Sequence, residues 1–215
     1  SISGTKIPVI DGDIATHAIV LAREGGALSL AIVDLDQPSV KRETLSTLDP
    51  TRGHARIVFN KAAASRLGAA GEGWDLAQAT LDRAAILVAF EQIGGAQACL
   101  DMAIDYAKSR HAFSRQIGSF QAIKHKLADM YVAVEIGRSN AHYGAWALAT
   151  RSEQLPLAAA AARLAACDAY HLAVKENIQV HGGAGFTWEI DCHLFYRRAK
   201  LLAVQAGGPG VWKEK

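Results

Sequence analysis

The amino-acid sequence predicts an α+β protein, with a partial antiparallel β-domain over residues 1–68 and an up-and-down four-helix bundle over residues 69–215. Three observations support this prediction. Residues 1–61 contain short apolar, β-branched runs between turn-forming residues, which is typical of strands. Beyond Gly71 the chain is rich in alanine and leucine, with apolar residues three and four positions apart, as on one face of a helix. The stretch "AAASRLGAAGEG" (62–73) separates the two patterns.

The predicted strands are "HAIVLA" (17–22), "LSLAIVDL" (28–35) and "ARIVFN" (55–60). The first two are separated by "REGGA", whose paired glycines favour a tight hairpin turn. The third follows "DPTRG" (49–53), which is a turn-forming sequence. Antiparallel pairing is the simplest arrangement for these strands. The chain opens at Ser1 within a strand pattern and without an initiator methionine, as expected of a fragment or a processed piece.

The predicted helices follow one another with short connections. The first covers 74–109 and contains the stretch "AAILVAF", which is apolar all round and is therefore expected to be buried on most sides. The second covers 117–148, where apolar residues recur at steps of three and four. Pro156 suits the first turn of a third helix that runs to about His181, and a last helix is expected over 188–203. Four such helices predict an up-and-down bundle.

The composition excludes several classes of function. Half of the residues are apolar and 20% are charged, so a packed core is easily supplied. A formal net charge of +2 gives no argument for nucleic-acid binding, and the 8 histidines have no spacing that suggests a metal site. Cys99, Cys167 and Cys192 lie far apart without a CxxC pair, which indicates reduced thiols in a cytoplasmic protein. Without a secretory signal or a run of 18 uncharged apolar residues, no membrane partner is expected.

Three glycines, Gly182, Gly183 and Gly185, fall within four positions between the third and fourth predicted helices. One explanation is a helix C-cap followed by a tight turn, because glycine adopts backbone conformations that other residues avoid. Another is a ligand site, because the missing Cβ atoms let backbone N–H groups approach a phosphate and the following helix presents its positive N-terminus. The pattern is neither GxGxxG nor a P-loop, and the two explanations are compatible.

The stretch "SRHAFSRQIGSFQAIKHKLADM" (109–130), followed later by "IQVHGGAGFTWE" (178–189), resembles the acyl-CoA dehydrogenase family. The shared features are RxxF at a turn, then FQxxxH and LADM on a helix, then QxxGGxGF, in the family's order and spacing. The resemblance covers essentially the whole chain, since "GTK" near the start is similar to the middle β-domain and 74–215 to the C-terminal bundle. The family's N-terminal helical domain and the first part of its β-domain have no counterpart here, and are expected on another chain or to have been lost.

Two local departures accompany the resemblance. After "GTK" the family commonly carries Trp-Ile-Ser/Thr beside the flavin ring, whereas this chain continues with "IPVID", including Pro8, Val9 and Ile10. This difference weakens the expectation that this subunit contacts the flavin ring. Ser114 stands where a glycine usually follows the phenylalanine of RxxF.

By this resemblance the expected cofactor is FAD, with its diphosphate and adenosine lying across a subunit interface. Arg110 matches the arginine that grips the diphosphate of the FAD held mainly by the neighbouring subunit, and the planar guanidinium suits phosphate oxygens. Without the motif around it, Arg110 would be interpreted as a solvated arginine at a helix end. The other matched cofactor-binding residues are Phe113, Gln121, Gln179, Gly182 and Gly183.

The implied reaction needs a base for the acyl α-proton, and a carboxylate is suitable if burial favours its protonated form near neutral pH. In much of the family a glutamate follows the stretch similar to "RRAK", but the matching residue here is Ala206. Other members carry the base on the first long helix, directly before an arginine, where this chain has Asp82 and Arg83. Asp82 is therefore the candidate catalytic residue, with a polar residue near a helix start as the alternative.

Arg83 is the candidate substrate-binding residue, near the acyl-CoA, and a structural ion pair is its alternative. Glu91 follows the apolar stretch "AAILVAF" and could be mistaken for a catalytic acid. At that depth on a helix it is expected to be a paired structural carboxylate.

The first functional hypothesis is an FAD-dependent acyl-CoA dehydrogenase subunit, an oxidoreductase of fatty acid and lipid metabolism. The α-proton of an acyl-CoA thioester would be abstracted while the β-hydrogen leaves as hydride to flavin N5. The second hypothesis is a catalytically silent partner subunit, and the third a truncated fragment, that supports FAD binding in a neighbouring chain. The resemblance implies a homo- or hetero-oligomer, expected as a dimer of dimers, with acyl-CoA as substrate and an electron-transfer flavoprotein as a partner.

Overall fold

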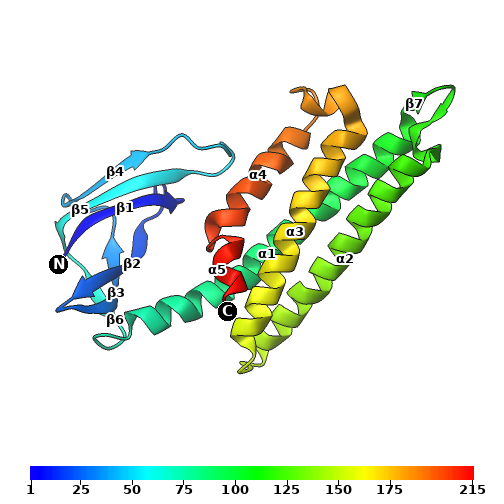
Figure 1. Cartoon of the computed structure of the whole chain (residues 1–215). Helices are drawn as coiled ribbons and strands as arrows, with labels where there is room; N and C mark the ends of the chain where they lie inside the picture. The colour runs from blue at the N-terminus through cyan, green and yellow to red at the C-terminus, as the bar shows by residue number, and fades with distance from the viewer. The chain divides into compact units, whose positions relative to one another are not determined.

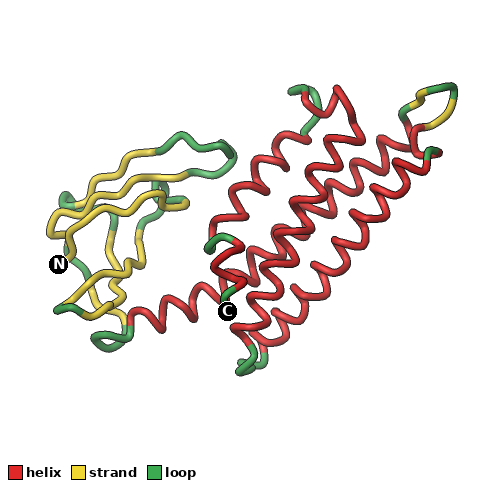
Figure 2. Tube along the Cα trace, in the orientation of Figure 1, coloured by secondary structure: helices red, strands yellow, loops and turns green.

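The computed structural model describes residues 1–215, and the contacts within the chain divide it into two compact units, Ser1–Thr80 and Leu81–Lys215. The strands of the two main sheets belong to the first unit and the helical bundle to the second, as the labels of Figure 1 and the colours of Figure 2 show. The predicted α+β fold class is thereby confirmed. Helix α1 (Gly73–Ser109) begins in the first unit and continues in the second. The domain boundary placed between residues 68 and 69 stays a prediction.

The β unit consists of two three-stranded sheets in which all neighbouring strands are antiparallel. One sheet has the order β1–β5–β4 and the other the order β2–β3–β6. The strands are β1 (Ile2–Ile10), β2 (His17–Glu24), β3 (Ala27–Asp34), β4 (Val40–Thr44), β5 (His54–Ala62) and β6 (Ser65–Leu67). Their apolar side chains form a core cluster whose buried members are Val20, Val33, Leu35, Ala55, Ile57, Phe59 and Ala62.

The predicted hairpin between β2 and β3 is confirmed. Glu24 pairs with Ala27, so Gly25 and Gly26 form a two-residue turn, and both glycines have positive φ (56° and 90°). A residue with a Cβ atom adopts such angles only at a steric cost, so the paired glycines favour this turn and the register that it sets.

Strands β4 and β6 are not predicted by the sequence pattern, because most of their residues are exposed and they lack a regular apolar face. Strand β1 is also largely exposed, and it lies at the edge of its sheet. Its register against β5 shifts between Lys6 and Val9, on either side of Pro8. Proline has no N–H to donate to a ladder and is confined to edges and bulges. Pairing with β5 is therefore irregular at Pro8 and resumes at Val9.

The helical unit is an up-and-down bundle, as predicted. Besides α1 it contains α2 (Gln121–Ala149), α3 (Leu155–His181), α4 (Cys192–Gln205) and the short α5 (Pro209–Lys213). Figure 1 shows α1, α2 and α3 side by side, with α4 next to α3. Proline occupies the first turn of α3, as expected.

Small residues let these helices approach one another closely. Gly95 of α1 faces Tyr170 of α3, and a Cβ atom added to it would lie 2.5 Å from the tyrosine ring. Gly137 of α2 likewise leaves no room for a side chain beside Ile93 of α1. Protein interiors are packed without spare volume, so these glycines contribute to the spacing of the helices. Around them the core is rich in alanine, including Ala89, Ala96, Ala103, Ala141, Ala162, Ala166, Ala169 and Ala173.

Two helices begin later than the sequence predicts, and one is not predicted at all. Before α2, Ile117–Ser119 forms a 3₁₀ turn (η1) and Phe120 is extended, so the helix begins at Gln121. Before α4, Gly182–Phe186 forms another 3₁₀ turn (η2), and the helix begins at Cys192 instead of residue 188. Helix α5 is too short to produce a recognisable apolar period.

The most apolar stretches of the bundle lie in its interior. In "AAILVAF" of α1 only Leu87 is exposed, so the expectation of burial on most sides is confirmed. By length and composition alone, one helical segment, Leu155–Phe186, could cross a membrane. However, 61% of its apolar window is buried inside the bundle, and the core helix of a soluble protein has the same properties. The segment is therefore weak evidence for a membrane span.

Candidate functional site

The two motifs that the sequence singles out lie at the same end of the bundle (Figure 1). One motif occupies the loop between α1 and α2, and the other the loop between α3 and α4. An aromatic contact joins the helices that lead into them, since the rings of Tyr106 in α1 and His181 in α3 stack with their centroids 4.2 Å apart. The structure thus brings the Arg110 motif and the glycine segment to one corner of the helical bundle.

The loop between α1 and α2 is a small hairpin of β7 (His111–Ala112) and β8 (Arg115–Gln116). Its two turn residues, Phe113 and Ser114, both have positive φ (53° and 63°). Two consecutive residues of this kind are typical of a type I′ turn, in which glycine is favoured. This geometry gives a physical reason why glycine would be favoured where this chain has Ser114.

The predicted cofactor residues of this loop are open to solvent. Arg110 and Gln121 are exposed, and Phe113 is 91% exposed. The backbone beneath them is ordered, because the Arg110 N–H donates to the Tyr106 carbonyl (2.8 Å) and the Ile117 N–H donates to the Arg110 carbonyl (2.9 Å). An exposed guanidinium on a fixed backbone is well arranged to bind an anion from outside the chain.

The glycine segment continues α3 as the 3₁₀ turn η2. Gly182 is the C-cap of α3, with φ 59° and ψ −135°, and its N–H donates to the carbonyl of Gln179, whose side chain is exposed. A Cβ atom added to Gly182 or Gly183 would meet no atom of the chain within 4 Å. Gly185 differs, because its Cβ atom would lie 2.7 Å from a carbonyl oxygen of α3. Gly182 and Gly183 therefore present open backbone, whereas Gly185 is required for packing.

The helix C-cap explanation of the glycines is confirmed, and one argument for the ligand explanation is wrong. Helix α4 does not follow the glycines directly, because η2 and a turn separate Gly183 from the helix start at Cys192. The positive N-terminus of a following helix is therefore not available at the glycines. Open backbone remains as the feature of this segment that suits a ligand.

We expect Gly182→Ala to lower the free energy of unfolding by about 1–2 kcal/mol, because an L-residue is strained at this positive φ. Gly183→Ala is the matched control. It has no positive φ and open space around it, so its effect should stay within about 0.5 kcal/mol. Urea unfolding of the two variants measures both values. An equal loss for both would contradict the backbone explanation.

The candidate base lies far from this corner. The length of α1 between Asp82 and Ser109 is about 40 Å at roughly 1.5 Å per residue, so the structure does not bring Asp82 and Arg110 together. Asp82 is not near a helix start either, because α1 begins at Gly73 and the acidic residue of its first turn is Asp75. The interpretation of Asp82 as a helix-start residue is therefore wrong.

Asp82 is buried and already has a cationic partner. Asp82 is 5% exposed, and the Lys215 ammonium forms an ion pair with its Oδ1. The same ammonium lies 4.5 Å from the centroid of the Trp212 ring. The ammonium therefore occupies one of the two carboxylate oxygens of Asp82.

The second base position is closed by the same C-terminal segment. Ala206 is buried just after α4, and its carbonyl accepts a hydrogen bond from Trp212 Nε1 (3.0 Å). Trp212 is 2% exposed and packs with Ala85 and Ile86 of α1. Helix α5 and the residues that follow it therefore link the two positions, because Trp212 contacts the backbone at one and Lys215 pairs with the carboxylate at the other.

Three other titratable groups of the bundle, Glu91, Cys99 and Cys192, have structural roles. Glu91 pairs with Arg198 at 2.8 Å, as predicted for a structural carboxylate. Burial raises the pKa of the Cys99 thiol to about 12 and also raises the pKa of Cys192, so both thiols remain protonated and unreactive. Arg83 is exposed, and its role toward a substrate stays a prediction.

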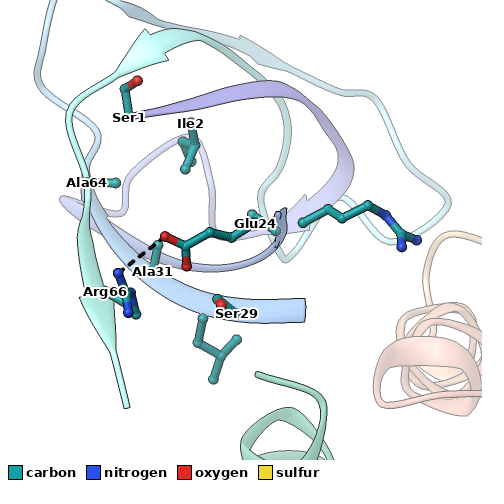
Figure 3. A pocket seen from close by; sticks show the side chains of 10 residues that line it. Ser1, Ile2, Glu24, Ser29, Ala31, Ala64 and Arg66 are labelled. Atoms are coloured by element: carbon teal, nitrogen blue, oxygen red, sulfur yellow. Dashed lines mark hydrogen bonds and ion pairs between the residues drawn. The ribbon is translucent and has the colours of Figure 1, made fainter. Parts of the chain in front are cut away.

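The β unit contains a cavity of ≈ 330 Å³ between the start of β1 and strands β2, β3 and β6 (Figure 3). Glu24 and Arg66 form an ion pair at its wall (3.2 Å), and the Ser29 hydroxyl accepts a hydrogen bond from the Gly71 N–H. The polar groups named here are thus satisfied within the chain. None of the residues predicted from the sequence to bind cofactor or substrate lines this cavity.

Sequence reasoning missed four residues that shape these positions: Tyr106, His181, Trp212 and Lys215. Tyr106 and His181 each lie close in sequence to a predicted motif, but nothing in their spacing indicates that their rings stack. Lys215 and Asp82 are 133 positions apart, and no local pattern predicts such a contact.

Comparisons with known proteins agree with the fold described above. A family model described as "Acyl-CoA dehydrogenase, C-terminal domain" matches residues 71–211. The chain is 41% identical over 191 residues to acyl-CoA dehydrogenase IpdE2 of Mycobacterium tuberculosis, covering 89% of this chain and 53% of that relative. It is 38% identical over 211 residues to acyl-CoA dehydrogenase FadE34 of the same organism, covering 98% of this chain and 28% of that relative.

Solved structures give the same result for the fold. The structure of butyryl-CoA dehydrogenase from Megasphaera elsdenii matches 99% of this chain with a TM-score of 0.94 and 27% sequence identity, and 58% of that protein is covered. The chain therefore spans a little over half the length of that structure and of IpdE2, and a smaller part of FadE34.

Proposed function

Because the chain belongs to the acyl-CoA dehydrogenase family, we propose that it is a subunit of an FAD-dependent enzyme that dehydrogenates an acyl-CoA thioester between its α and β carbons. Within that assembly, the chain helps to hold FAD that a neighbouring chain binds by its other end, and it does not supply the catalytic base. The observation that carries this role is the ion pair between Lys215 and the buried Asp82. The other base position holds Ala206, which cannot accept a proton.

The corner formed by the two loops fits the ADP half of FAD. The exposed Arg110 guanidinium can form paired hydrogen bonds with a diphosphate. The open backbone at Gly182 and Gly183 lets a phosphate or ribose approach without meeting a Cβ atom. The exposed ring of Phe113 offers a flat apolar surface beside them. FAD, when bound, supplies the acceptor for the hydride that leaves the β-carbon.

The surroundings of Asp82 argue against a role as general base. A base needs a free lone pair within about 3 Å of the proton that it removes. Lys215 already contacts Asp82, and the residue has almost no exposed surface. Separating such a pair would leave a buried charge without a partner, which is strongly unfavourable. The carboxylate is therefore better suited to fastening α1 to the C-terminal segment than to proton transfer.

We expect Asp82→Asn to leave the rate of anaerobic flavin bleaching by acyl-CoA thioesters within about twofold of the parent, whereas loss of a true general base costs about 10²–10⁴-fold. The measurement uses the purified assembly, with FAD content and melting temperature recorded for each variant. Asp75→Asn, in the first turn of the same helix, is the matched control. A hundredfold loss in Asp82→Asn, with FAD content and folding intact, would assign the base to Asp82 and make this chain the catalytic subunit.

The remaining properties of the assembly follow from the same proposal. Residues that bind a neighbour's FAD require a homo- or hetero-oligomer, and we propose a dimer of dimers with an electron-transfer flavoprotein as electron acceptor. The three buried, unpaired cysteines support a reducing compartment, and the cytoplasm is proposed on that basis. Native mass spectrometry of the purified complex, together with its flavin content, tests the subunit composition.

A further inference from the structure

His181 is the last residue of α3, directly before Gly182, and it is only 6% exposed. Two contacts of its ring hold it in place. Its ring stacks on Tyr106 at an interplanar angle of 30°, and its Nδ1 lies 2.9 Å from the carbonyl oxygen of Asn177, one turn earlier. Its Cβ atom lies 3.1 Å from the position that a Cβ atom on Gly185 would occupy. The glycine turn therefore packs back onto His181.

Tyr106 holds the corresponding place at the end of α1. It lies one turn before Arg110, and its carbonyl accepts the Arg110 N–H. The next residue, Ala107, lies against η1, which directly follows the β7–β8 hairpin, because a Cβ atom added to Gly118 would lie 2.9 Å from its carbonyl oxygen. Each of the two loops therefore follows closely on one member of the Tyr106–His181 stack.

We infer that Tyr106 and His181 are positioning residues, whose stacked rings fix the distance between Arg110 and the Gly182–Gly183 backbone. This inference rests on the proposed function, since it concerns the part of FAD that both loops would hold. A ligand that bridges two loops binds more tightly when the loops are already correctly spaced, because less freedom is lost on binding. Neither ring needs to touch the cofactor to have this effect.

A purely structural contact would behave differently. Loss of any core contact lowers stability. Only loss of the Tyr106–His181 stack should also weaken FAD binding, and a substitution that restores an aromatic ring should then restore that binding. His142 offers a comparison, because its ring contacts Phe90 edge-on with centroids 5.4 Å apart. Phe90 lies well before the end of α1 and His142 well after the start of α2, so both are far from the helix ends that form the corner. Val134, fully buried in α2, offers a core site outside the two loops.

The test measures the dissociation constant of FAD from the purified assembly, using the fluorescence of released flavin. His181→Ala is expected to raise this constant by about 3- to 10-fold, the affinity equivalent of one aromatic pair. His181→Phe keeps a ring at the same place and should stay within about twofold of the parent. Tyr106→Leu keeps apolar bulk without a ring, and should resemble His181→Ala if that variant is too unstable to purify.

The controls are His142→Ala and Val134→Ala, which should lower the melting temperature without raising the dissociation constant. The inference is overturned if Val134→Ala weakens FAD binding as much as His181→Ala, or if His181→Phe and His181→Ala behave alike. If Arg110→Ala weakens FAD binding and His181→Ala does not, the inference is wrong and the proposed function stands. If neither variant changes FAD binding, the proposed function fails together with the inference.

Discussion

Replacing Arg163 with alanine is expected to lower the free energy of unfolding by about 2–6 kcal/mol, because two buried acceptors lose their donor and each costs about 1–3 kcal/mol. The guanidinium lies in α3 and has no exposed surface. Its Nη1 donates to Gln92 Oε1 of α1 (2.5 Å), and its Nη2 donates to the Leu202 carbonyl of α4. Leu202 is among the last four residues of α4, whose carbonyls lack helical donors. Arg163 therefore ties three helices together.

The electrostatics of the same site support a structural role. Burial lowers the pKa of Arg163, and the nearby sulfur of Cys167, 3.1 Å from Nη1, opposes that change. A guanidinium nevertheless stays protonated in proteins. Its hydrogen bonds must therefore offset the cost of burying a charge, and removing the side chain leaves a space that neighbouring residues cannot fill.

The matched control for Arg163→Ala is Arg138→Ala on α2. The Arg138 side chain is 39% exposed and bonds to Glu135 and Gln97. Partly exposed ion pairs contribute about 0–1 kcal/mol, so this variant should lose no more than that. Urea unfolding measured under one set of conditions compares the two. A loss below about 1 kcal/mol for Arg163→Ala would contradict the importance assigned to the buried contacts.

Replacing Arg110 with alanine is expected to weaken FAD binding to the assembly by about 10- to 100-fold. Hydrogen bonds to a charged group contribute about 1.5–3 kcal/mol, and 1.4 kcal/mol corresponds to a factor of ten in affinity. Arg110→Lys should give an intermediate value, because an ammonium keeps the charge without the planar pair of donors. Since the Arg110 side chain is exposed, unfolding should change by no more than about 0.5 kcal/mol.

Lys108→Ala is the control for charge alone, because this exposed lysine lies in the last turn of α1, just before Arg110. It should retain FAD nearly as well as the parent, since a solvated charge nearby contributes little without direct contact. FAD content per subunit and the dissociation constant are measured for all three variants. Full retention of FAD in Arg110→Ala would remove the main residue from the proposed cofactor corner.

Much of the fold can be predicted from the sequence, because the helices are long and many of the signals are local. The apolar period of α2, the proline at the start of α3 and the paired glycines of the β2–β3 turn each act within a few residues. Strand β4 and helix α5 depend on partners far along the chain and give no such signal. An arginine within an alanine-rich run, such as Arg163, likewise gives no indication that it is buried.

The candidate site, likewise, can be predicted only in part from the sequence. Arg110 and the glycine segment are recognisable as motifs, and the structure places both at one end of the bundle. The contact that joins them, between Tyr106 and His181, depends on how α1 and α3 pack and has no sequence signature. The ion pair between Lys215 and Asp82 also has no sequence signature, and it changes the interpretation of Asp82, the residue that most resembles a base.

The alanine-rich interior restricts how this protein can vary. Alanine has no side-chain rotamers, so the buried alanines of α3 have no alternative arrangement with which to absorb a larger neighbour. These alanines form a seam, the close contact between α3 and its neighbouring helices. A single added methyl group in this seam must separate two helix backbones, and the loops at their ends would move with them. Adaptation to new substrates or partners is therefore expected to proceed through loops and exposed faces, while the seam itself tolerates little change over evolutionary time.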